Sequence, residues 1–271
     1  MKESGRKILN IIAALGVDRG GTWTRVAAFD ARLRRIKTAR FRTSSLRSLP
    51  SKLVPLISGW GAASAPLVIA SRGVFSKKWK KPFLLKALAG KLHLADVISD
   101  AEAAHYAAFQ GGSGLLLIAG TGAVVFAGKT GAFKKTGGFN PPSGDPGSGR
   151  WLGRCYLQKL GRKADDSANA HGRTAAHAAR LLARAERGDG DCALLAAAAW
   201  HEISELLKSA AGGGGGTVTV SLAGGLMENP YFRNGFLKAA RRALAGRRLS
   251  VVKAGMSAEE AAARLALRRK R

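Results

Sequence analysis

The sequence predicts an α/β fold built from two similar halves. Strand-like and helix-like segments alternate along its 271 residues, and 46% of the residues are hydrophobic, which is enough for two cores. Residues 11–29 and 115–127 share one outline, namely a short apolar strand, a glycine turn that contains a threonine, and a second strand. Such self-similarity indicates an internal duplication.

The first half opens on a hairpin. Thr24–Phe29 is rich in β-branched and aromatic residues, and the preceding Gly20-Gly21 allows a tight turn. The alanine-rich segment Ala101–Phe109 has the composition of a helix. The expected strands are 11–17, 24–29, 36–41, 67–70 and a short one ending at 97–98, and the expected helices are 46–58, 82–92 and 101–109.

The pattern restarts after Gly111-Gly112. Gly128–Gly131 predicts a hairpin turn, Gly137–Gly149 a long loop, and Gly212–Gly216 a flexible spacer. The expected strands are 115–119, 124–127, 217–222 and 249–252, and the expected helices are 150–160, 174–186, 192–211, 231–245 and 258–267.

The chain is strongly basic, with 45 Lys and Arg against 17 Asp and Glu, a net charge of +28 and a pI near 11.3. Residues 1–105 hold 20 basic and 6 acidic side chains, and residues 106–271 hold 25 and 11, so the excess is spread. We therefore expect weak, salt-sensitive binding to any polyanion and no specific nucleic-acid partner.

Cys155 and Cys192 form no CxxC motif, so we expect free thiols and neither a disulfide framework nor a zinc site. Basic residues precede the apolar run 8–17 as in a signal peptide, but no cleavage motif follows, and we expect a buried strand. The run 115–127 is broken by glycines and too short for a membrane helix. The expected location is the cytoplasm, without membrane contact.

Asp18 ends the first expected strand and is followed by Gly20, Gly21 and Thr22. Such a turn can direct backbone N–H groups at phosphate oxygens while the acid faces a metal ion. A plain hairpin turn with a solvated acid explains the same residues, so both interpretations stay open. The segment 120–122 repeats the turn without the acid.

Asp100 lies at the junction of a strand and a helix, where a carboxylate can accept a proton from a substrate hydroxyl. A helix start is the alternative interpretation, because Ser99 and Glu102 have capping-box spacing and an acid suits the first helical turn. Further on, Asp145 lies in the long glycine-rich loop, and Gly224-Gly225 is a turn whose bare backbone suits contact with a flat ring. Acids at turns in so basic a chain indicate a chemical role.

Five segments together resemble a known family. GVDRGGTWTR, ISDAEAA, LLLIAGTGAVVFAG, GGFNPPSGDPGSGRWLGR and VSLAGGLMEN occur in the order and rough spacing of the N-acetylglucosamine kinase and BadF-type ATPase family. That family is part of the actin-like, sugar-kinase and Hsp70 superfamily, and the resemblance covers residues 14–267. It implies two ribonuclease-H-like domains, 1–110 and 111–271, with the last helix packing back on the first domain. It also implies a cleft between the domains that binds Mg-ATP and an acceptor.

The resemblance also implies roles for individual residues. Asp100 matches the catalytic base, and Asp18 matches the residue that reaches Mg²⁺ directly or through water. The implied nucleotide-binding residues are Asp18, Gly20, Gly21, Thr22, Gly120, Thr121, Gly122, Ala223, Gly224, Gly225 and Asn229. The implied sugar-contacting residues are Gly138, Phe139, Asn140 and Asp145.

The sequence departs from the family pattern at several of these sites. Arg19 stands where the family has Gly, Ser99 where it usually has Asn, Ala123 where it often has Ser, and Pro146 where it has Glu. The segment 43–45 also lacks the Asn that sugar kinases use there. The nucleotide-binding motifs therefore match the family better than the acceptor-binding motifs do.

The first functional expectation is an ATP-dependent kinase that phosphorylates a hydroxyl of an N-acetylglucosamine-like amino sugar or a related small sugar. Phosphoryl transfer depends mainly on positioning and charge neutralisation, which glycine turns, Mg²⁺ and a carboxylate base supply. Two alternatives stay open, a non-kinase ATPase of the same fold and a catalytically silent, sugar-sensing protein. The identity of the acceptor and the oligomeric state also stay open, a homodimer included.

Overall fold

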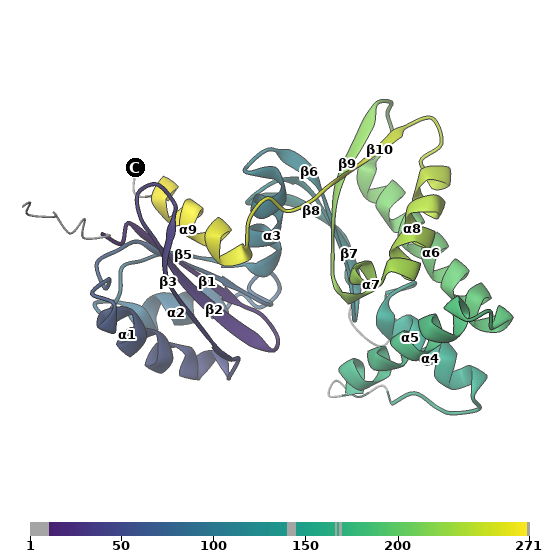
Figure 1. Cartoon of the computed structure of the whole chain (residues 1–271), viewed down its shortest axis with the longest axis horizontal. Helices are drawn as coiled ribbons and strands as arrows, with labels where there is room; N and C mark the ends of the chain where they lie inside the picture. Colours follow the sequence, from purple (N-terminus) through teal and green to yellow (C-terminus); the bar gives the residue numbers. More distant parts are fainter. Residues whose placement is uncertain (1–10, 140–144, 166, 168–169, 270–271) are drawn as a thin grey trace, which may run out of the picture. The chain divides into compact units, whose positions relative to one another are not determined.

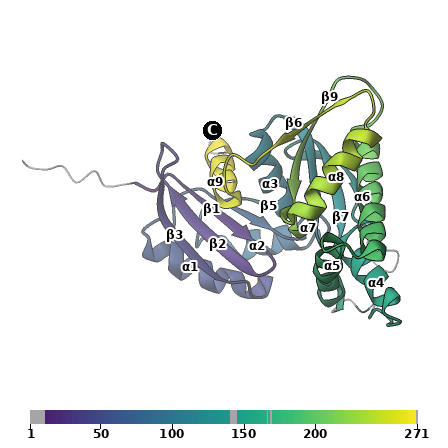
Figure 2. The same ribbon diagram turned by 45° about the vertical axis from the view of Figure 1, so that its right-hand side comes forward.

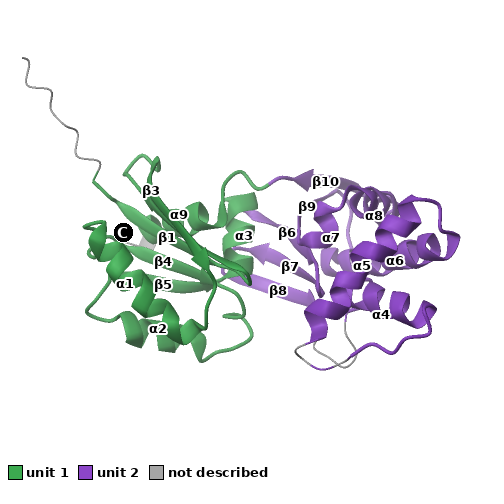
Figure 3. Cartoon of the chain, turned by 60° about the horizontal axis from the view of Figure 1, so that its bottom comes forward, with its two compact units in different colours: residues 1–110, 254–271 green, residues 111–253 purple. Residues whose placement is uncertain are grey.

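The computed structural model describes residues 11–139, 145–165, 167 and 170–269 (Figure 1). The chain forms two compact units, coloured in Figure 3. Residues 1–110 and 254–271 make up unit 1, and residues 111–253 make up unit 2. Each unit contains a five-stranded sheet with parallel and antiparallel neighbours, so the α/β fold is confirmed.

The sheet of unit 1 has the strand order β3-β2-β1-β4-β5, in which the hairpin strands are antiparallel and β1, β4 and β5 run parallel. Its elements are β1 (Ala14–Arg19), β2 (Trp23–Phe29), β3 (Arg35–Arg42), η1 (Leu46–Ser48), α1 (Leu49–Gly59), β4 (Leu67–Ser71), α2 (Lys80–Leu88), β5 (Leu94–Ser99), α3 (Asp100–Phe109) and α9 (Ala258–Arg269).

The last helix, α9, packs on the first strand of unit 1, so the chain returns to unit 1 after completing unit 2. Gly16 on β1 makes this possible, because a Cβ atom there would lie 1.7 Å from the carbonyl oxygen of Glu259. The buried alanines Ala262, Ala263 and Ala266 complete the contact with the sheet. Helices α1 and α2 cover the opposite face of the sheet (Figure 1).

The sheet of unit 2 has the strand order β10-β9-β6-β7-β8. Its elements are β6 (Ser113–Ala119), β7 (Ala123–Lys129), β8 (Ala132–Gly137), α4 (Gly149–Lys159), α5 (His171–Glu186), α6 (Gly190–Ala211), β9 (Thr217–Ala223), α7 (Gly225–Glu228), α8 (Pro230–Ala243) and β10 (Arg248–Val252). Side chains of β6, β7 and β9 form one core with α4, α5, α6 and α8, and α6 lies beside α8 (Figure 2).

The two sheets have the same topology. In each, an antiparallel three-strand meander is followed by two strands that run parallel to its first strand, β4 and β5 in unit 1 and β9 and β10 in unit 2. The duplication expected from residues 11–29 and 115–127 is therefore present in the fold. Strand β8 was not expected, because its exposed lysines, Lys134 and Lys135, hide the strand pattern.

Two further sequence expectations concern covalent and membrane features. Cys155 and Cys192 are both free thiols. Among the described residues, none of the helices has the length and the apolar character needed to cross a bilayer.

Candidate functional site

The first glycine turn joins β1 to β2 in unit 1. Asp18 lies opposite Arg25 in the hairpin register, and their side chains form an ion pair of 3.0 Å. The N–H of Gly20 donates to the carbonyl oxygen of Trp23 and closes the turn. Burial raises the pKa of Asp18 above its ordinary value, an effect that Arg25 opposes and that the negative charges of Glu259 and Asp100 reinforce.

Asp100 is the first residue of α3, and the N-cap residue of that helix is Ser99. Ser99 and Glu102 form a reciprocal capping box, in which the side chain of each accepts a hydrogen bond from the other's backbone N–H. The carboxylate of Asp100 accepts a hydrogen bond from Ala101 N at 3.1 Å. Burial raises the pKa of Asp100, and the positive charge of Arg72 partly offsets this effect.

Arg19, which departs from the family pattern, connects the first glycine turn to two other segments. Its Nη2 donates to the carbonyl oxygen of Ser44 at 2.6 Å, and its own carbonyl oxygen accepts from Arg72 N at 3.2 Å. Burial lowers the pKa of Arg19. A large cationic side chain therefore lies at the turn where the family has glycine.

In unit 2, the second glycine turn packs against two other glycine-containing segments. Gly149 N, at the start of α4, donates to Gly120 O at 2.7 Å. Gly224 has φ +95°, and a Cβ atom there would lie 2.3 Å from the carbonyl oxygen of Ala119. Glycine is therefore needed at position 224 both for its backbone conformation and for this close approach.

These segments line one cavity of about 370 Å³. Four of the predicted residues are on its wall, namely Gly120, Thr121, Gly225 and Asn229. The rest of the wall is small or apolar, from α4, α5 and α7, and consists of Gly149, Gly172, Ala175, Ala176, Ala178, Ala179, Leu182 and Leu226. A cavity lined by bare backbone and small side chains suits a flat, largely apolar ring system.

Asp145 holds the second glycine turn in place. Its buried carboxylate accepts from Ala123 N at 3.0 Å and from Phe139 N, and it leaves no room for a side chain at Gly122. Gly138 N donates to Ala123 O at 2.8 Å. Because each carboxylate oxygen has two lone pairs, Asp145 retains capacity for a further donor. Asn140 lies outside the described residues.

Replacing Asp145 by alanine is expected to destabilise unit 2, because Ala123 N loses its buried acceptor. One buried donor without a partner costs about 1–3 kcal/mol. Urea unfolding of the variant measures the loss. The control is Glu205→Ala, which removes an exposed carboxylate paired with Lys208 at 3.5 Å and should cost less than ~1 kcal/mol. Equal losses in the two variants would contradict the role of Asp145 in holding the turn.

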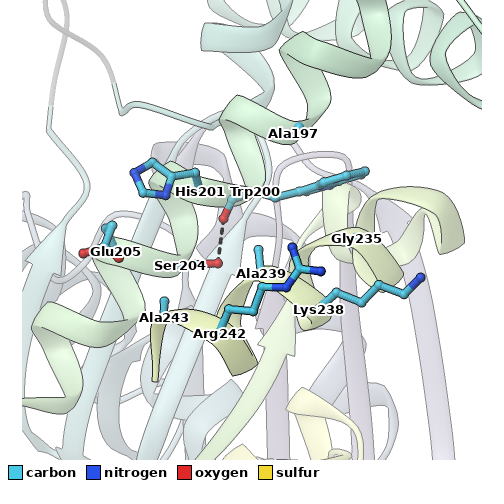
Figure 4. A pocket seen from close by; sticks show the side chains of 10 residues that line it. All are labelled: Ala197, Trp200, His201, Ser204, Glu205, Gly235, Lys238, Ala239, Arg242 and Ala243. Carbon is cyan, nitrogen blue, oxygen red and sulfur yellow. Dashed lines mark hydrogen bonds between the residues drawn. The ribbon is translucent and has the colours of Figure 1, made fainter. Parts of the chain in front are cut away.

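A second cavity in unit 2, of about 530 Å³, lies between α6 and α8 (Figure 4). The indole ring of Trp200 forms one wall and rests on the bare backbone of Gly235, where a Cβ atom would be 2.1 Å from the ring. Exposed Lys238 and Arg242 line the other side. None of the predicted site residues lines this cavity, so it is separate from the glycine turns.

The metal expectation concerns Mg²⁺, which binds proteins through one or two carboxylates together with water and substrate phosphates. Asp18 fits this use, because it is a largely buried carboxylate with Glu259 and Asp100 close enough to add negative potential. The described part of the chain contains no group of three or more His, Cys, Asp or Glu side chains that could enclose a metal ion. Asp18 would therefore be the carboxylate that contacts a Mg²⁺ ion bound to substrate phosphates.

Several residues near the site were not identified from the sequence. Ala175 and Ala179 line the 370 Å³ cavity, and their spacing of four residues on a helix is the signal that could have placed them on one face. The positive charges of Arg72 and Lys80 act on Asp100, and both residues follow β4 in the sequence. Several cations after a strand end raise the local affinity for anions, which is the signal that could have found them.

No protein-family model matches the sequence, and no curated protein matches it. Solved structures do match in fold. A provisionally assigned N-acetylglucosamine kinase from Chromobacterium violaceum has 21% identity and a TM-score of 0.65, over 95% of this chain and 99% of that one. A provisionally assigned N-acetylmannosamine kinase from Listeria monocytogenes has 16% identity and a TM-score of 0.66, over 95% and 99%.

A third structure is a ROK family glucokinase from Streptomyces griseus in complex with glucose and AMPPNP. It has 16% identity and a TM-score of 0.53, over 93% of this chain and 98% of that one. At such identities the likeness concerns the fold. It confirms that this α/β chain shares the fold of these sugar-kinase structures over more than nine-tenths of its length.

Proposed function

We propose that the protein is an ATP-dependent sugar kinase that transfers the γ-phosphate to a hydroxyl of an amino sugar or a related small sugar. The observation that carries the proposal is the 370 Å³ cavity of unit 2, which brings the second glycine turn together with Gly225 and Asn229. The fold neighbours support it, since they include sugar kinases and one of them is complexed with glucose and AMPPNP.

In this proposal unit 2 holds the nucleotide. The adenine ring lies against the small side chains of α5 and the backbone at Gly225. The backbone N–H groups of Thr121 and Gly122 are offered to the phosphates, since Gly120 N already donates to Gly122 O within the turn. Asp145 fixes that turn by accepting a hydrogen bond from Ala123 N, directly after it. Mg²⁺, when bound, neutralises charge on the phosphates, and Asp18 is the residue that would hold it.

Unit 1 supplies the chemistry at the acceptor hydroxyl. Asp100 accepts the hydroxyl proton, and because the transition state of phosphoryl transfer is loose, this proton moves late. Burial of Asp100 raises its pKa, which makes the carboxylate a stronger base once ionised. The capping box at Ser99 and Glu102 fixes the first turn of α3, and therefore the position of Asp100.

Mg-ATP binding can be tested with a variant that narrows the cavity. A Cβ atom added at Gly225 meets nothing within 4 Å, so Gly225→Val is expected to fold and to place its methyl groups beside the nucleotide space. We expect its Mg-ATP affinity to fall by at least about tenfold, which is 1.4 kcal/mol. At a hundred times its dissociation constant, Mg-ATP should stabilise the wild type by about 2.7 kcal/mol in thermal unfolding.

The matched control is Gly213→Val, which also meets no atom within 4 Å but lies in the spacer before β9, away from the cavity. It should bind Mg-ATP as the wild type does. A wild type that shows no thermal shift at millimolar Mg-ATP would remove the nucleotide from the proposal.

Coupled ADP release with a panel of neutral, amino and N-acetylated sugars tests the activity itself. The kinase proposal expects ADP release that depends on one class of sugar. Release that is the same without sugar would favour the non-kinase ATPase, and Mg-ATP binding without any release would favour the silent, sugar-sensing protein.

A further inference from the structure

A group of cations lies close together in unit 1, two of its members act on the charge of Asp100, and no step of the proposed phosphate transfer uses the group. Its members are Arg19, Arg72 and Lys80, which we call the basic cluster. Arg19 ends β1, Arg72 directly follows β4, and Lys80 begins α2. In the described part of the chain, none of the three forms a salt bridge, although carboxylates elsewhere in unit 1 do, such as Asp30 and Asp96.

Hydrogen bonds fix the positions of these cations relative to the first glycine turn. Lys80 Nζ donates to the carbonyl oxygen of Arg72 at 2.7 Å, and Arg72 N donates to the carbonyl oxygen of Arg19 at 3.2 Å. The guanidinium of Arg72 lies against Gly21, since a Cβ atom there would be 3.1 Å from its Nη1. Arg72 therefore lies beside the turn that the sequence predicts as a phosphate site, and Lys80 lies beside Arg72.

The charges of the cluster act on one another and on Asp100. Burial lowers the pKa of Lys80, and the positive charges of Arg19, Lys77 and Arg72 lower it further, while Asp100 opposes them. Cations held close together create a positive potential that a bound anion would relieve. The side chain of Arg72 is exposed and makes no hydrogen bond in the described structure, so its guanidinium is available to a ligand.

We propose that Arg72 and Lys80 bind an anionic oxygen group beside Asp100, with phosphate-like chemistry. The role of this anion site rests on the proposed kinase function, but binding of the anion can be measured without turnover. Two sources supply such a group at a kinase site, the γ-phosphate of ATP and a phosphate carried by the acceptor sugar. In either case, charge-assisted hydrogen bonds from a guanidinium and an ammonium hold the group next to the base.

The test begins with calorimetric titration of inorganic phosphate into the full chain at constant ionic strength. Arg72→Gln is the main variant, because the native side chain has no structural bond to lose. Lys80→Gln is the second variant, and Arg72→Lys is the conservative one. Lys78→Gln is the control, since it removes the same charge from an exposed lysine two residues before Lys80.

We expect Arg72→Gln and Lys80→Gln to weaken phosphate binding about tenfold or more, as for the loss of a charge-assisted hydrogen bond, while Lys78→Gln changes it less than about twofold. Arg72→Lys should retain part of the affinity. Equal effects of Arg72→Gln and Lys78→Gln, or a wild type that binds no phosphate at millimolar concentration, would overturn the inference.

Two further binding measurements show whether the bound anion is the γ-phosphate of ATP or a phosphate of the acceptor sugar. If the cluster holds the γ-phosphate, Arg72→Gln should weaken Mg-ATP but not Mg-ADP. If it holds a phosphate of the acceptor, the variant should weaken N-acetylglucosamine 6-phosphate but not N-acetylglucosamine. If Arg72→Gln weakened the binding of neither Mg-ATP nor N-acetylglucosamine 6-phosphate, the inference would be contradicted. Failure of the kinase proposal would look different, because phosphate binding would remain sensitive to Arg72 while no sugar, neutral or phosphorylated, stimulated ADP release.

Discussion

Asp100→Asn is expected to lower turnover by roughly 10²- to 10⁴-fold with a sugar that the wild type phosphorylates, because an amide cannot accept the hydroxyl proton. Affinity for Mg-ATP should change little, since the residues proposed to hold the nucleotide are Asp18 and the glycine turns. The substitution should leave the N-terminus of α3 folded, because Ser99 and Glu102 form its capping box. Steady-state kinetics of ADP release measures both quantities.

Glu102→Gln is the matched control for this substitution. It makes the same change from carboxylate to amide in the same helical turn, and glutamine also serves at this position of a capping box. Its turnover should stay close to that of the wild type. Turnover of Asp100→Asn within about threefold of the wild type would remove Asp100 from the role of base.

Asp100 should also make stability depend on pH. Its pKa in the folded protein lies above the ordinary value of 3.8, so the folded state holds the proton more tightly than the unfolded state does. Stability therefore falls as pH rises from about 3.8 through the raised pKa. Asp100→Asn, which cannot ionise, should melt at a higher temperature than the wild type at neutral pH, and this advantage should vanish below pH 3.8.

Gly16→Ala is expected to destabilise unit 1 strongly, although it adds only one methyl group. The new Cβ atom would lie 1.7 Å from Glu259 O and 2.8 Å from Ala263 N, which are backbone atoms of α9 and cannot rotate away. The helix must therefore move off β1. We expect a loss at or above the upper end of the ~1–3 kcal/mol typical of overpacked cores, measured by urea unfolding.

Gly59→Ala is the control for added methyl groups at glycine. It lies at the end of α1, where a Cβ atom meets nothing within 4 Å. This variant should be neutral or more stable by up to ~1 kcal/mol, because alanine favours the helix. If Gly16→Ala unfolded at the same urea concentration as Gly59→Ala, the close packing of α9 on β1 described above would be contradicted.

Most of the fold was accessible from the sequence because local patterns determine it. The glycine turns at 20–21 and 120–122 are flanked by apolar runs, and these became the β1–β2 and β6–β7 hairpins. The contact between Gly16 and Glu259 was not accessible, because the two residues lie in the first strand and the last helix. No local pattern connects such distant segments.

The candidate site was only partly accessible for the same reason. The capping box at Ser99 and Glu102 is a local motif, but its consequence for Asp100 needed the geometry of α3. Asp145 stood out as an acid in a glycine-rich loop, yet its hydrogen bond to Ala123 N joins segments 22 residues apart. The position of Arg72 against Gly21 depends on the pairing of β1 with β4, which sequence periodicity does not specify.

Transfer of phosphate from ATP to a sugar is tested most directly by following a label. The wild type is incubated with ATP labelled in the γ-phosphate, Mg²⁺ and each sugar of the panel, and the products are separated by chromatography. We predict labelled sugar phosphate with at least one sugar, and its loss in Asp100→Asn. Label found only as inorganic phosphate or only as unreacted ATP, with every sugar, would contradict the proposed kinase activity.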